Sequence, residues 1–536
     1  MRAVAHAPPF RQNAACGGSA GGRRQQRAGR RQARSAKARA AGRTENVQAS
    51  AHAEEQELVR VLAVTDLHVD YEENMRWCEA LPASPRDVLV LSGDVSDELA
   101  ALEAALGTLS SKFGAVFYCP GNHELWVRER NRASGVRDSL TKLRRIRELC
   151  ARLGVHMQPR QLGSLWVAPL LSWHHRSWDT EPDIPGVPPP SHWTVSDYSA
   201  CKWPHSVPGG DRHGSLELAE WFDAMNDTPA WQRMLATRHA CDVVSFSHFL
   251  PHQALLPEKR YLYFPNLTKA AGSAPLGARL QRLQPDIHLF GHTHFAWDAR
   301  LGGSRYIQAP LCSPLERRRR LFTVGFGASM EAAKEDPEGA PWLPLVVYQG
   351  LVPAGAIEGL QAEAAAEGAA AAAAGAGDVA PAPAVVLPSN GSNGSSTRSG
   401  NANSSSSGGS SSSGGGRRVA GRQQAGEGAA PLQQQQQQTE QQQQGQQQGQ
   451  PPQQPALQRP APLLVELIAA GWRPLRHGVE TPPLLAHWSE YYEEHSRQPE
   501  VVALAPWVAD RWKRRRARAA ARSSGESSGS EPEDAG

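Results

Sequence analysis

Residues 59–68 read VRVLAVTDLH and place an aspartate and a histidine directly after an apolar run. Only Arg60 interrupts this valine-rich run, which is typical of a strand that is buried on both faces. Asp66 and His68 stand two residues apart where the strand should end. As the chain turns there, both side chains can therefore converge on one ion.

The same arrangement, a strand-like run followed by polar side chains, recurs four more times in the first 300 residues. The runs at 87–92, 115–119, 242–246 and 286–290 lead into Gly93-Asp94-Val95-Ser96-Asp97, Gly121-Asn122-His123-Glu124, Ser247-His248 and Gly291-His292-Thr293-His294. Further strands are expected at 165–171, 305–311 and 343–348, and helices at 98–109 and 138–153. Strands that alternate with helices indicate an α/β protein with layered sheets. Such proteins usually build their sites at the carboxyl ends of strands.

The polar blocks offer carboxylate oxygens, an amide oxygen and imidazole nitrogens, which suit zinc, manganese or iron. Each block alone could consist of capping or buried residues without a functional role. All five in this order, each after a strand-like run, predict a site for two divalent metal ions that cleaves a phosphate ester.

The order of these motifs resembles the calcineurin-like metallophosphoesterase superfamily, whose members carry D-x-H, G-D-x-x-D, G-N-H-D/E, a lone His and G-H-x-H. The resemblance covers residues 58–350 and implies a four-layer α/β/β/α sandwich with a binuclear metal centre. It also implies hydrolysis of a phosphomonoester or phosphodiester by attack of a metal-bound hydroxide.

The resemblance assigns a role to each matching position. One metal is expected to be held by Asp66, His68 and His294, and the second by Asn122, His248 and His292, with Asp94 bridging the two. His123 matches the histidine that contacts the phosphate and protonates the leaving oxygen. Asp97 matches the acid that orients this histidine in several branches, and Glu124 is expected to be supportive.

The chain departs from the motif residues of two better-known branches of the superfamily, and these departures indicate which members it resembles. Asp97 stands where purple acid phosphatases place a tyrosine ligand. Residues 93–99 read GDVSDEL, whereas Ser/Thr protein phosphatases carry G-D-x-V-D-R-G. The chain is therefore more similar to bacterial-type members and to plant and algal relatives. The expected substrate is a phosphorylated small molecule.

Two other functions are compatible with the sequence. The first is a non-catalytic binding scaffold, because some members of this fold have lost catalysis; this chain, however, keeps every motif. The second is a nuclease, which needs a basic groove lined with aromatic side chains. The segment 173–211 is rich in Trp and His, but Lys and Arg are sparse near it, so a nucleic-acid partner is not expected. This segment is either an ordered loop near the site or an irregular surface insertion.

Composition divides the chain into five parts. Residues 1–53 precede the first strand, and the first 44 hold ten Arg and one Lys and no acid before Glu45. This composition is typical of a transit peptide, and a chloroplast is the expected location, with mitochondrion or cytoplasm as alternatives. The catalytic domain is expected at 58–351, a disordered low-complexity insertion at 353–462, a segment that packs on the catalytic domain at 463–515, and a disordered tail at 516–536. No apolar stretch is long enough to span a membrane.

Overall fold

The computed structural model describes residues 55–133, 135–191, 194–319, 343–373, 462–484 and 486–523. These residues all belong to one compact unit. The predicted transit peptide, and the predicted low-complexity insertion from residue 374 to 461, lie outside the described residues. Within the described ranges, no helix combines the length and apolarity needed to cross a membrane.

The first sheet has seven strands in the order β12-β13-β11-β1-β2-β3-β4. Their bounds are β1 Gln56–Val64, β2 Ser84–Ser92, β3 Phe113–Cys119, β4 Val155–His156, β11 Leu345–Pro353, β12 Arg473–Pro474 and β13 Gly478–Glu480. Strands β1 to β4 are parallel, with Val61 opposite Val88, and β11 runs antiparallel to β1. The carboxyl ends of β1, β2 and β3 therefore meet at one edge of the sheet.

The second sheet has six strands in the order β5-β6-β7-β8-β10-β9. Their bounds are β5 Arg160–Leu162, β6 Leu165–Pro169, β7 Asp242–Phe246, β8 Ile287–Leu289, β9 Trp297–Leu301 and β10 Ser304–Gln308. Strands β6, β7, β8 and β10 are parallel. This sheet also brings the carboxyl ends of its central strands to one edge.

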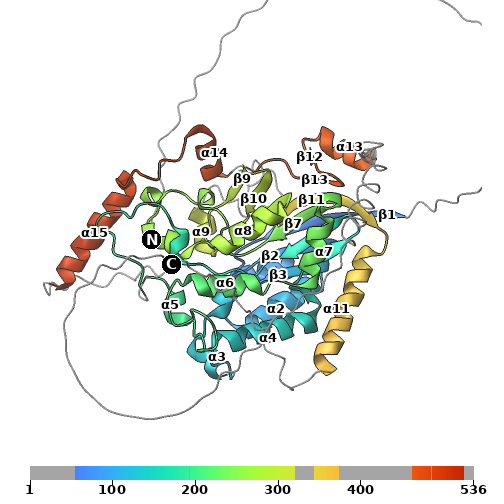
Figure 1. Ribbon diagram of the computed structural model, residues 1–536, viewed down its shortest axis with the longest axis horizontal. Helices are drawn as coiled ribbons and strands as arrows, with labels where there is room; N and C mark the ends of the chain where they lie inside the picture. The colour runs from blue at the N-terminus through green and yellow to red at the C-terminus, as the bar shows by residue number, and fades with distance from the viewer. Residues whose placement is uncertain are drawn as a thin grey trace, which may run out of the picture. The chain divides into compact units, whose positions relative to one another are not determined.

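The two sheets pack face to face, and helices cover their outer faces (Figure 1). Alternation along β6 shows the layering, because Val167 lies in the core shared with the first sheet while Trp166 packs against the helices outside. Helices α2 Leu99–Ser110, α4 Ser139–Leu153 and α11 Ala356–Ala373 lie against the first sheet and each other. Helices α7 Pro229–Thr237 and α8 Ala274–Leu283 pack on the second. The predicted layered α/β architecture is confirmed.

Local signals set the bounds of α4. Asp138 caps its first turn by accepting a hydrogen bond from the Thr141 backbone N–H, and Gly154 ends it with a φ of 72°. The remaining helices are α1 Glu72–Ala80, α3 Glu129–Ala133, α5 Asp197–Ala200, α6 Leu216–Ala224, α9 Pro314–Arg319, α13 Pro462–Ala469, α14 His487–Glu494 and α15 Pro506–Ser523.

Backbone pairing joins the two sheets beside the ends of β1 and β10. The Thr65 N–H donates to the Ala309 carbonyl at 3.0 Å, and the Leu311 N–H donates to the Thr65 carbonyl at 2.8 Å. One residue on, the Cys312 N–H donates to the Asp66 carbonyl at 2.9 Å. The first predicted ligand block therefore lies at the seam between the sheets.

Two predicted boundaries are wrong. The composition predicts that the insertion begins at residue 353, but α11 extends from 356 to 373 and buries Ile357, Leu360 and Ala364. Its alanine-rich composition resembles low complexity, yet these side chains pack on α4 and β3. The composition also predicts a tail from residue 516, but α15 continues to Ser523.

The segment after residue 462 contacts the layers described above. β13 pairs with β11, with Gly478 opposite Gly350. In α14, the Tyr492 ring packs against Trp297 of β9, and its hydroxyl accepts a hydrogen bond from the Glu258 backbone N–H. These contacts extend the first sheet and cover the outer strand of the second.

Candidate metal centre

The predicted ligands follow the carboxyl ends of five strands, and most of them have a left-handed backbone. Positive φ values occur at Asp66 (53°), His68 (46°), Asp94 (51°), His292 (74°) and His294 (58°). Such values are uncommon for residues other than glycine and cluster at functional sites. The sharp turns aim the side chains across the strand ends instead of along the strands.

Gly93 allows a close approach between the two sheets. Its φ is 76°, and a Cβ at this position would lie 2.5 Å from His248 Nδ1 and 2.7 Å from the Gly121 backbone nitrogen. Any side chain would therefore push apart three of the ligand-bearing loops. This close approach is the physical reason for a glycine before Asp94.

The first donor group contains Asp66, His68, Asp94 and His294, whose donor atoms all lie within 4.8 Å of one another. The Nε2 atoms of His68 and His294 are 3.0 Å apart, and His294 Nε2 is 3.6 Å from Asp66 Oδ1. Two imidazole nitrogens and two carboxylates thus converge on one point.

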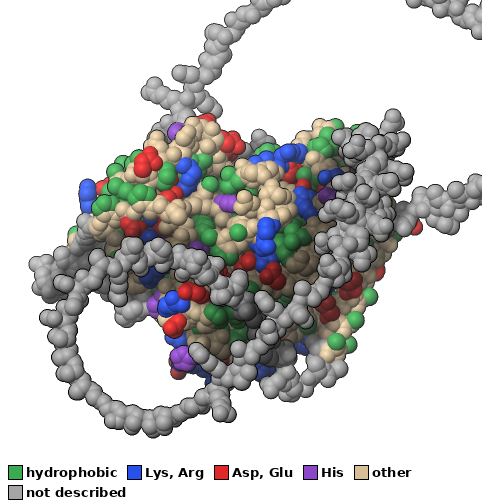
Figure 2. All heavy atoms as spheres, viewed as in Figure 1, with side chains coloured by type: hydrophobic (Ala, Val, Ile, Leu, Met, Phe, Trp, Pro, Cys, Tyr) green, Lys and Arg blue, Asp and Glu red, His purple; other side chains and the backbone are tan. Residues whose placement is uncertain are grey.

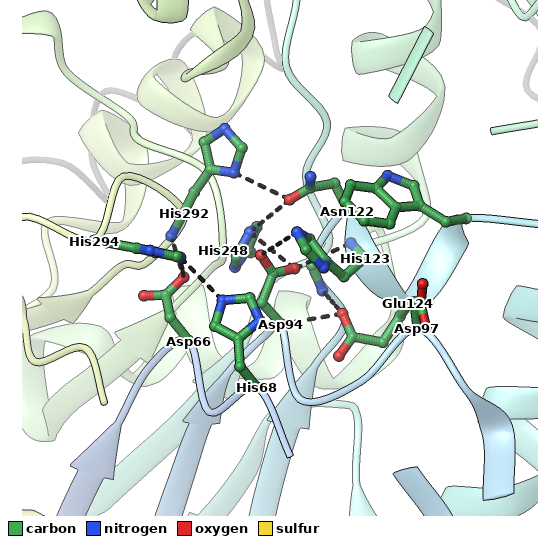
Figure 3. A network of polar contacts seen from close by, with 12 residues as sticks. Asp66, His68, Asp94, Asp97, Asn122, His123, Glu124, His248, His292 and His294 are labelled. Atoms are coloured by element: carbon green, nitrogen blue, oxygen red, sulfur yellow. Dashed lines mark hydrogen bonds and ion pairs between the residues drawn. The ribbon is translucent and has the colours of Figure 1, made fainter. Parts of the chain in front are cut away.

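The second donor group contains Asp94, His248 and His292, within the same 4.8 Å limit. The amide oxygen of Asn122 joins it, at 3.0 Å from His248 Nε2 and 3.0 Å from His292 Nδ1. Asp94 Oδ1 lies 3.4 Å from His248 Nε2. Asp94 belongs to both groups and stands between them (Figure 3).

The remaining ring nitrogens of three histidines face acceptors, which fixes the tautomers. His248 Nδ1 lies 2.9 Å from the Ser92 carbonyl, and His292 Nε2 lies 2.9 Å from the Ala270 carbonyl. His294 Nδ1 lies 3.1 Å from the Glu316 carboxylate. Because these oxygens accept, protons sit on those nitrogens, and the opposite nitrogens are the ones left to bind an ion at the centre. This arrangement is typical of histidines that bind metal.

Burial and charge set the protonation of the donors. Burial lowers the pKa of His68, and it lowers the pKa of His292 to about 3, so both rings are neutral. Burial raises the pKa of Asp94, but His123 and His248 outweigh it and hold that pKa well below its ordinary value. Burial also lowers the pKa of His248, yet the Asp94 carboxylate beside it raises the value to about 9, so an ion bound at Nε2 would displace a proton from this ring.

Hydrogen bonds hold the carboxylates in place. Asp66 accepts from the Thr65 hydroxyl at 2.6 Å and from the His292 backbone N–H at 2.7 Å. Glu124 accepts from the backbone N–H groups of Gly121 at 2.7 Å and Val95 at 2.5 Å. Glu124 therefore ties together the loops that carry Asp94 and Asn122, in keeping with the supportive role expected for it.

His123 lies at the exposed side of the centre, with 26% of its side chain accessible to solvent. Its Nε2 is 3.7 Å from Asp94 Oδ2, and its ring packs against Trp126 with 3.6 Å between the centroids and 31° between the ring planes. Burial lowers its pKa to about 4 against the opposing charge of Asp94. A phosphate group next to the ring would favour its protonated form.

The prediction that Asp97 orients His123 is wrong. The Asp97 carboxylate forms ion pairs with Arg128 and Arg130, and Lys142 donates to its backbone carbonyl at 2.6 Å. Two guanidinium groups outcompete an imidazole for one carboxylate because they are permanently charged. His123 instead packs against the Trp126 ring.

Two further carboxylates at the centre were not predicted from the sequence. Glu316 contacts His294, and Asp197 contacts the amide of Asn122. Asp197 lies within the Trp- and His-rich segment 173–211, which therefore reaches the centre. The composition of that segment pointed to its aromatic and His residues. No sequence pattern distinguishes Asp197 from its neighbours.

The structure thus brings together the seven predicted metal ligands and His123, and it separates Asp97 from them.

The family model for calcineurin-like phosphoesterases matches residues 59–296. A curated relative, the acyl-carrier-protein phosphodiesterase PptH of Mycobacterium tuberculosis, is 39% identical over 70 residues, which cover 13% of this chain and 22% of that protein.

The solved structures that are similar to this chain include two that illustrate the range. The phosphopantetheinyl hydrolase PptH from Mycobacterium tuberculosis gives a TM-score of 0.39 at 20% identity, over 49% of this chain and 92% of that one. A protein from Thermus thermophilus gives a TM-score of 0.27 at 13% identity, over 47% of this chain and 89% of that one. By the match of the family model, residues 59–296 belong to the calcineurin-like phosphoesterase family.

Proposed function

We propose that this protein is a metal-dependent hydrolase that cleaves phosphate esters with two divalent metal ions. The observation that carries the proposal is the pair of donor groups that share Asp94. The first ion would be held by Asp66, His68, Asp94 and His294, and the second by Asp94, Asn122, His248 and His292. Manganese, zinc and iron suit this mixture of oxygen and nitrogen donors.

Ions bound there would lower the pKa of a coordinated water and neutralise charge on the phosphate. The protein's own contribution is orientation. Asp66 and Asp94 accept hydrogen bonds, and the outer nitrogens of His248, His292 and His294 face oxygen acceptors, so these donors need little rearrangement to bind. The His123 side chain is 26% exposed, against 0% for His248 and 20% for His294. It is therefore placed to hold a proton for the leaving oxygen.

The relative's name makes phosphodiesters the first substrate class to test, with phosphomonoesters as the comparison. A groove for nucleic-acid backbones needs uniform basic charge, whereas Arg128 beside Trp126 is paired with Asp97 and the face drawn in Figure 2 carries acidic and basic side chains intermixed. A small phosphorylated molecule, or such a group attached to a carrier, therefore fits the proposal better than a nucleic acid.

The test uses the full chain, stripped of metal by a chelator and reloaded with Mn²⁺, Zn²⁺ or Fe²⁺. Hydrolysis of 4-nitrophenyl phosphate and of bis(4-nitrophenyl) phosphate is measured while bound metal is quantified by mass spectrometry. We expect two ions per chain, and turnover that is lost with the metal and returns with it. Metal binding without turnover on either ester would support the scaffold alternative, and turnover in metal-free protein would overturn the proposal.

A further inference from the structure

Asp197 lies outside the five motif blocks, and its side chain contacts residues of the metal centre. It is the first residue of α5, within the segment between β6 and α6, and its side chain is 5% exposed. Its Oδ1 accepts hydrogen bonds from Asn122 Nδ2 at 2.8 Å and from Trp126 Nε1 at 2.7 Å. Its Oδ2 lies 3.0 Å from His174 Nε2.

We infer that Asp197 is a positioning residue that orients both Asn122 and His123. The inference rests on the proposed function, because it concerns the same centre. It assigns one buried carboxylate to two tasks: presenting the amide oxygen of Asn122 to the second donor group, and holding the ring on which His123 stacks.

The first task follows from the chemistry of an amide. Asn122 can turn either its oxygen or its NH₂ group toward the centre, and only the oxygen is a metal ligand. An ionised carboxylate only accepts hydrogen bonds, so the group facing Asp197 must be the NH₂. The oxygen is thereby turned to His248 Nε2 and His292 Nδ1, each 3.0 Å away.

The second task acts through Trp126. The hydrogen bond from the Trp126 indole N–H to Asp197 fixes the rotation of the indole ring. The His123 ring packs against this indole with 3.6 Å between centroids. Arg128 lies 4.6 Å from the centroid of the same indole. Since Asp97 is paired with Arg128 and Arg130, the Trp126 ring, together with Asp94 and the His68 ring, orients His123.

The backbone beside Trp126 is held without the Asp197 carboxylate. The Val127 N–H donates to the Ala200 carbonyl at 2.8 Å, and Lys142 Nζ donates to the Trp126 carbonyl at 2.7 Å. Removing the carboxylate should therefore release two side chains while the loop keeps its path. A purely structural role for Asp197 would instead appear as lost stability with normal metal affinity.

The test compares four variants of the full chain with the wild type: Asp197→Ala, Asp197→Asn, Trp126→Phe and the control Asp242→Asn. Asp242 is also a buried carboxylate, but it lies at the start of β7, far along the strand from His248, and accepts from the Arg476 and His477 backbones. Metal affinity is measured by chelator competition with Zn²⁺ or Mn²⁺, turnover with the aryl phosphates at saturating metal, and stability by thermal unfolding.

Asp197→Ala should weaken metal affinity by about 10–100-fold, the usual cost of losing a partner of a ligand, and should also lower turnover at saturating metal. Asp197→Asn should lose less but still lose some of both, because its amide oxygen can accept from Asn122 and Trp126 while its NH₂ group no longer excludes the flipped Asn122 amide. Trp126→Phe should keep metal affinity and lower turnover. Asp242→Asn should change neither, whatever it costs in stability.

Wild-type affinity and turnover in Asp197→Ala would overturn the inference while leaving the proposed function intact. Should Asp197→Ala fail to fold, Asp197→Asn decides the matter, since unchanged affinity and turnover in that variant would also overturn it. If the wild type binds metal but hydrolyses neither ester, the proposed function fails. A weaker affinity in Asp197→Ala would even then support the orientation of Asn122.

Discussion

The two sheets supply different chemistry to the same centre. The first sheet, through β1, β2 and β3, provides the carboxylates Asp66 and Asp94, the Asn122 amide, and the imidazoles of His68 and His123 (Figure 3). The second sheet, through β7 and β8, provides only imidazoles, those of His248, His292 and His294. Every negative charge among the proposed ligands therefore comes from the first sheet.

This difference explains how each side is supported. The first sheet's carboxylates accept from hydroxyl and backbone N–H groups, as Asp66 does from Thr65. The second sheet's imidazoles donate to oxygens, as His248 does to the Ser92 carbonyl. Each donor group draws on both sheets, so a bound ion would tie them together where their backbones meet at Thr65. The negative charge of the proposed ligands is concentrated on the first sheet. Substitutions on that sheet should therefore reduce metal binding and turnover more than substitutions on the second sheet.

Asp94→Asn should have the largest effect, because Asp94 belongs to both donor groups. The change removes a negative charge shared by two cations, so both should be lost. We expect a fall in turnover greater than the roughly 100-fold that follows loss of a ligand's partner. Bound metal and aryl phosphate hydrolysis are the measurements. Asp97→Asn is the matched control, since Asp97 is also buried but pairs with arginines, and retention of two ions in Asp94→Asn would contradict the assignment.

His123→Ala should come next, because His123 is placed to act on the substrate. Removing a proton donor typically costs about 10²–10⁴-fold in rate, and the two donor groups stay complete. Turnover should therefore fall while the metal content remains near two ions per chain. A His123→Ala protein that loses metal would show that the ring belongs to a donor group, and the first sheet would then supply one more ligand.

The positions of the seven proposed ligands could be predicted because each stands in a short motif directly after an apolar strand. Strand ends in parallel sheets meet in space, so local pattern was enough to bring distant positions together. The supporting carboxylates carry no such local signal. Asp197 lies 75 residues from Asn122, and its neighbours Ser196 and Tyr198 form no motif with it.

The errors have the same physical origin. Asp97 has the right spacing for the acid that orients His123, but its partners, 31 and 33 residues further along, are arginines. The α11 helix was missed because alanine, a strong helix former, also dominates low-complexity segments. Three buried side chains, Ile357, Leu360 and Ala364, distinguish the two cases. In both instances a tertiary contact overrides what the local sequence indicates.

Glu316→Gln should have a smaller effect and tests the second sheet's side of the comparison. The glutamine oxygen can still accept from His294 Nδ1, so only the charge is lost. We expect metal affinity to weaken by about 10-fold, at the lower end for a partner of a ligand. Chelator competition measures the change. A loss as large as that in Asp197→Ala would show that the imidazoles of the second sheet need charged support as much as the Asn122 amide does.

His156→Leu should leave turnover unchanged and alter only stability, because His156 lies on β4 at the far edge of the first sheet. Burial, aided by Arg160, lowers its pKa from 6.5 to about 4. The unfolded chain therefore takes up a proton as pH falls below 6.5 while the folded protein stays neutral, so stability is full above that pH and declines toward pH 4. The His156 imidazole alone accounts for a loss on the order of 3 kcal/mol in the free energy of unfolding.

Urea unfolding at pH 7 and pH 4.5 should show a smaller difference in the free energy of unfolding for His156→Leu than for the wild type. An equal difference in both proteins would contradict this role of His156 and show that the acid sensitivity arises at other titratable groups.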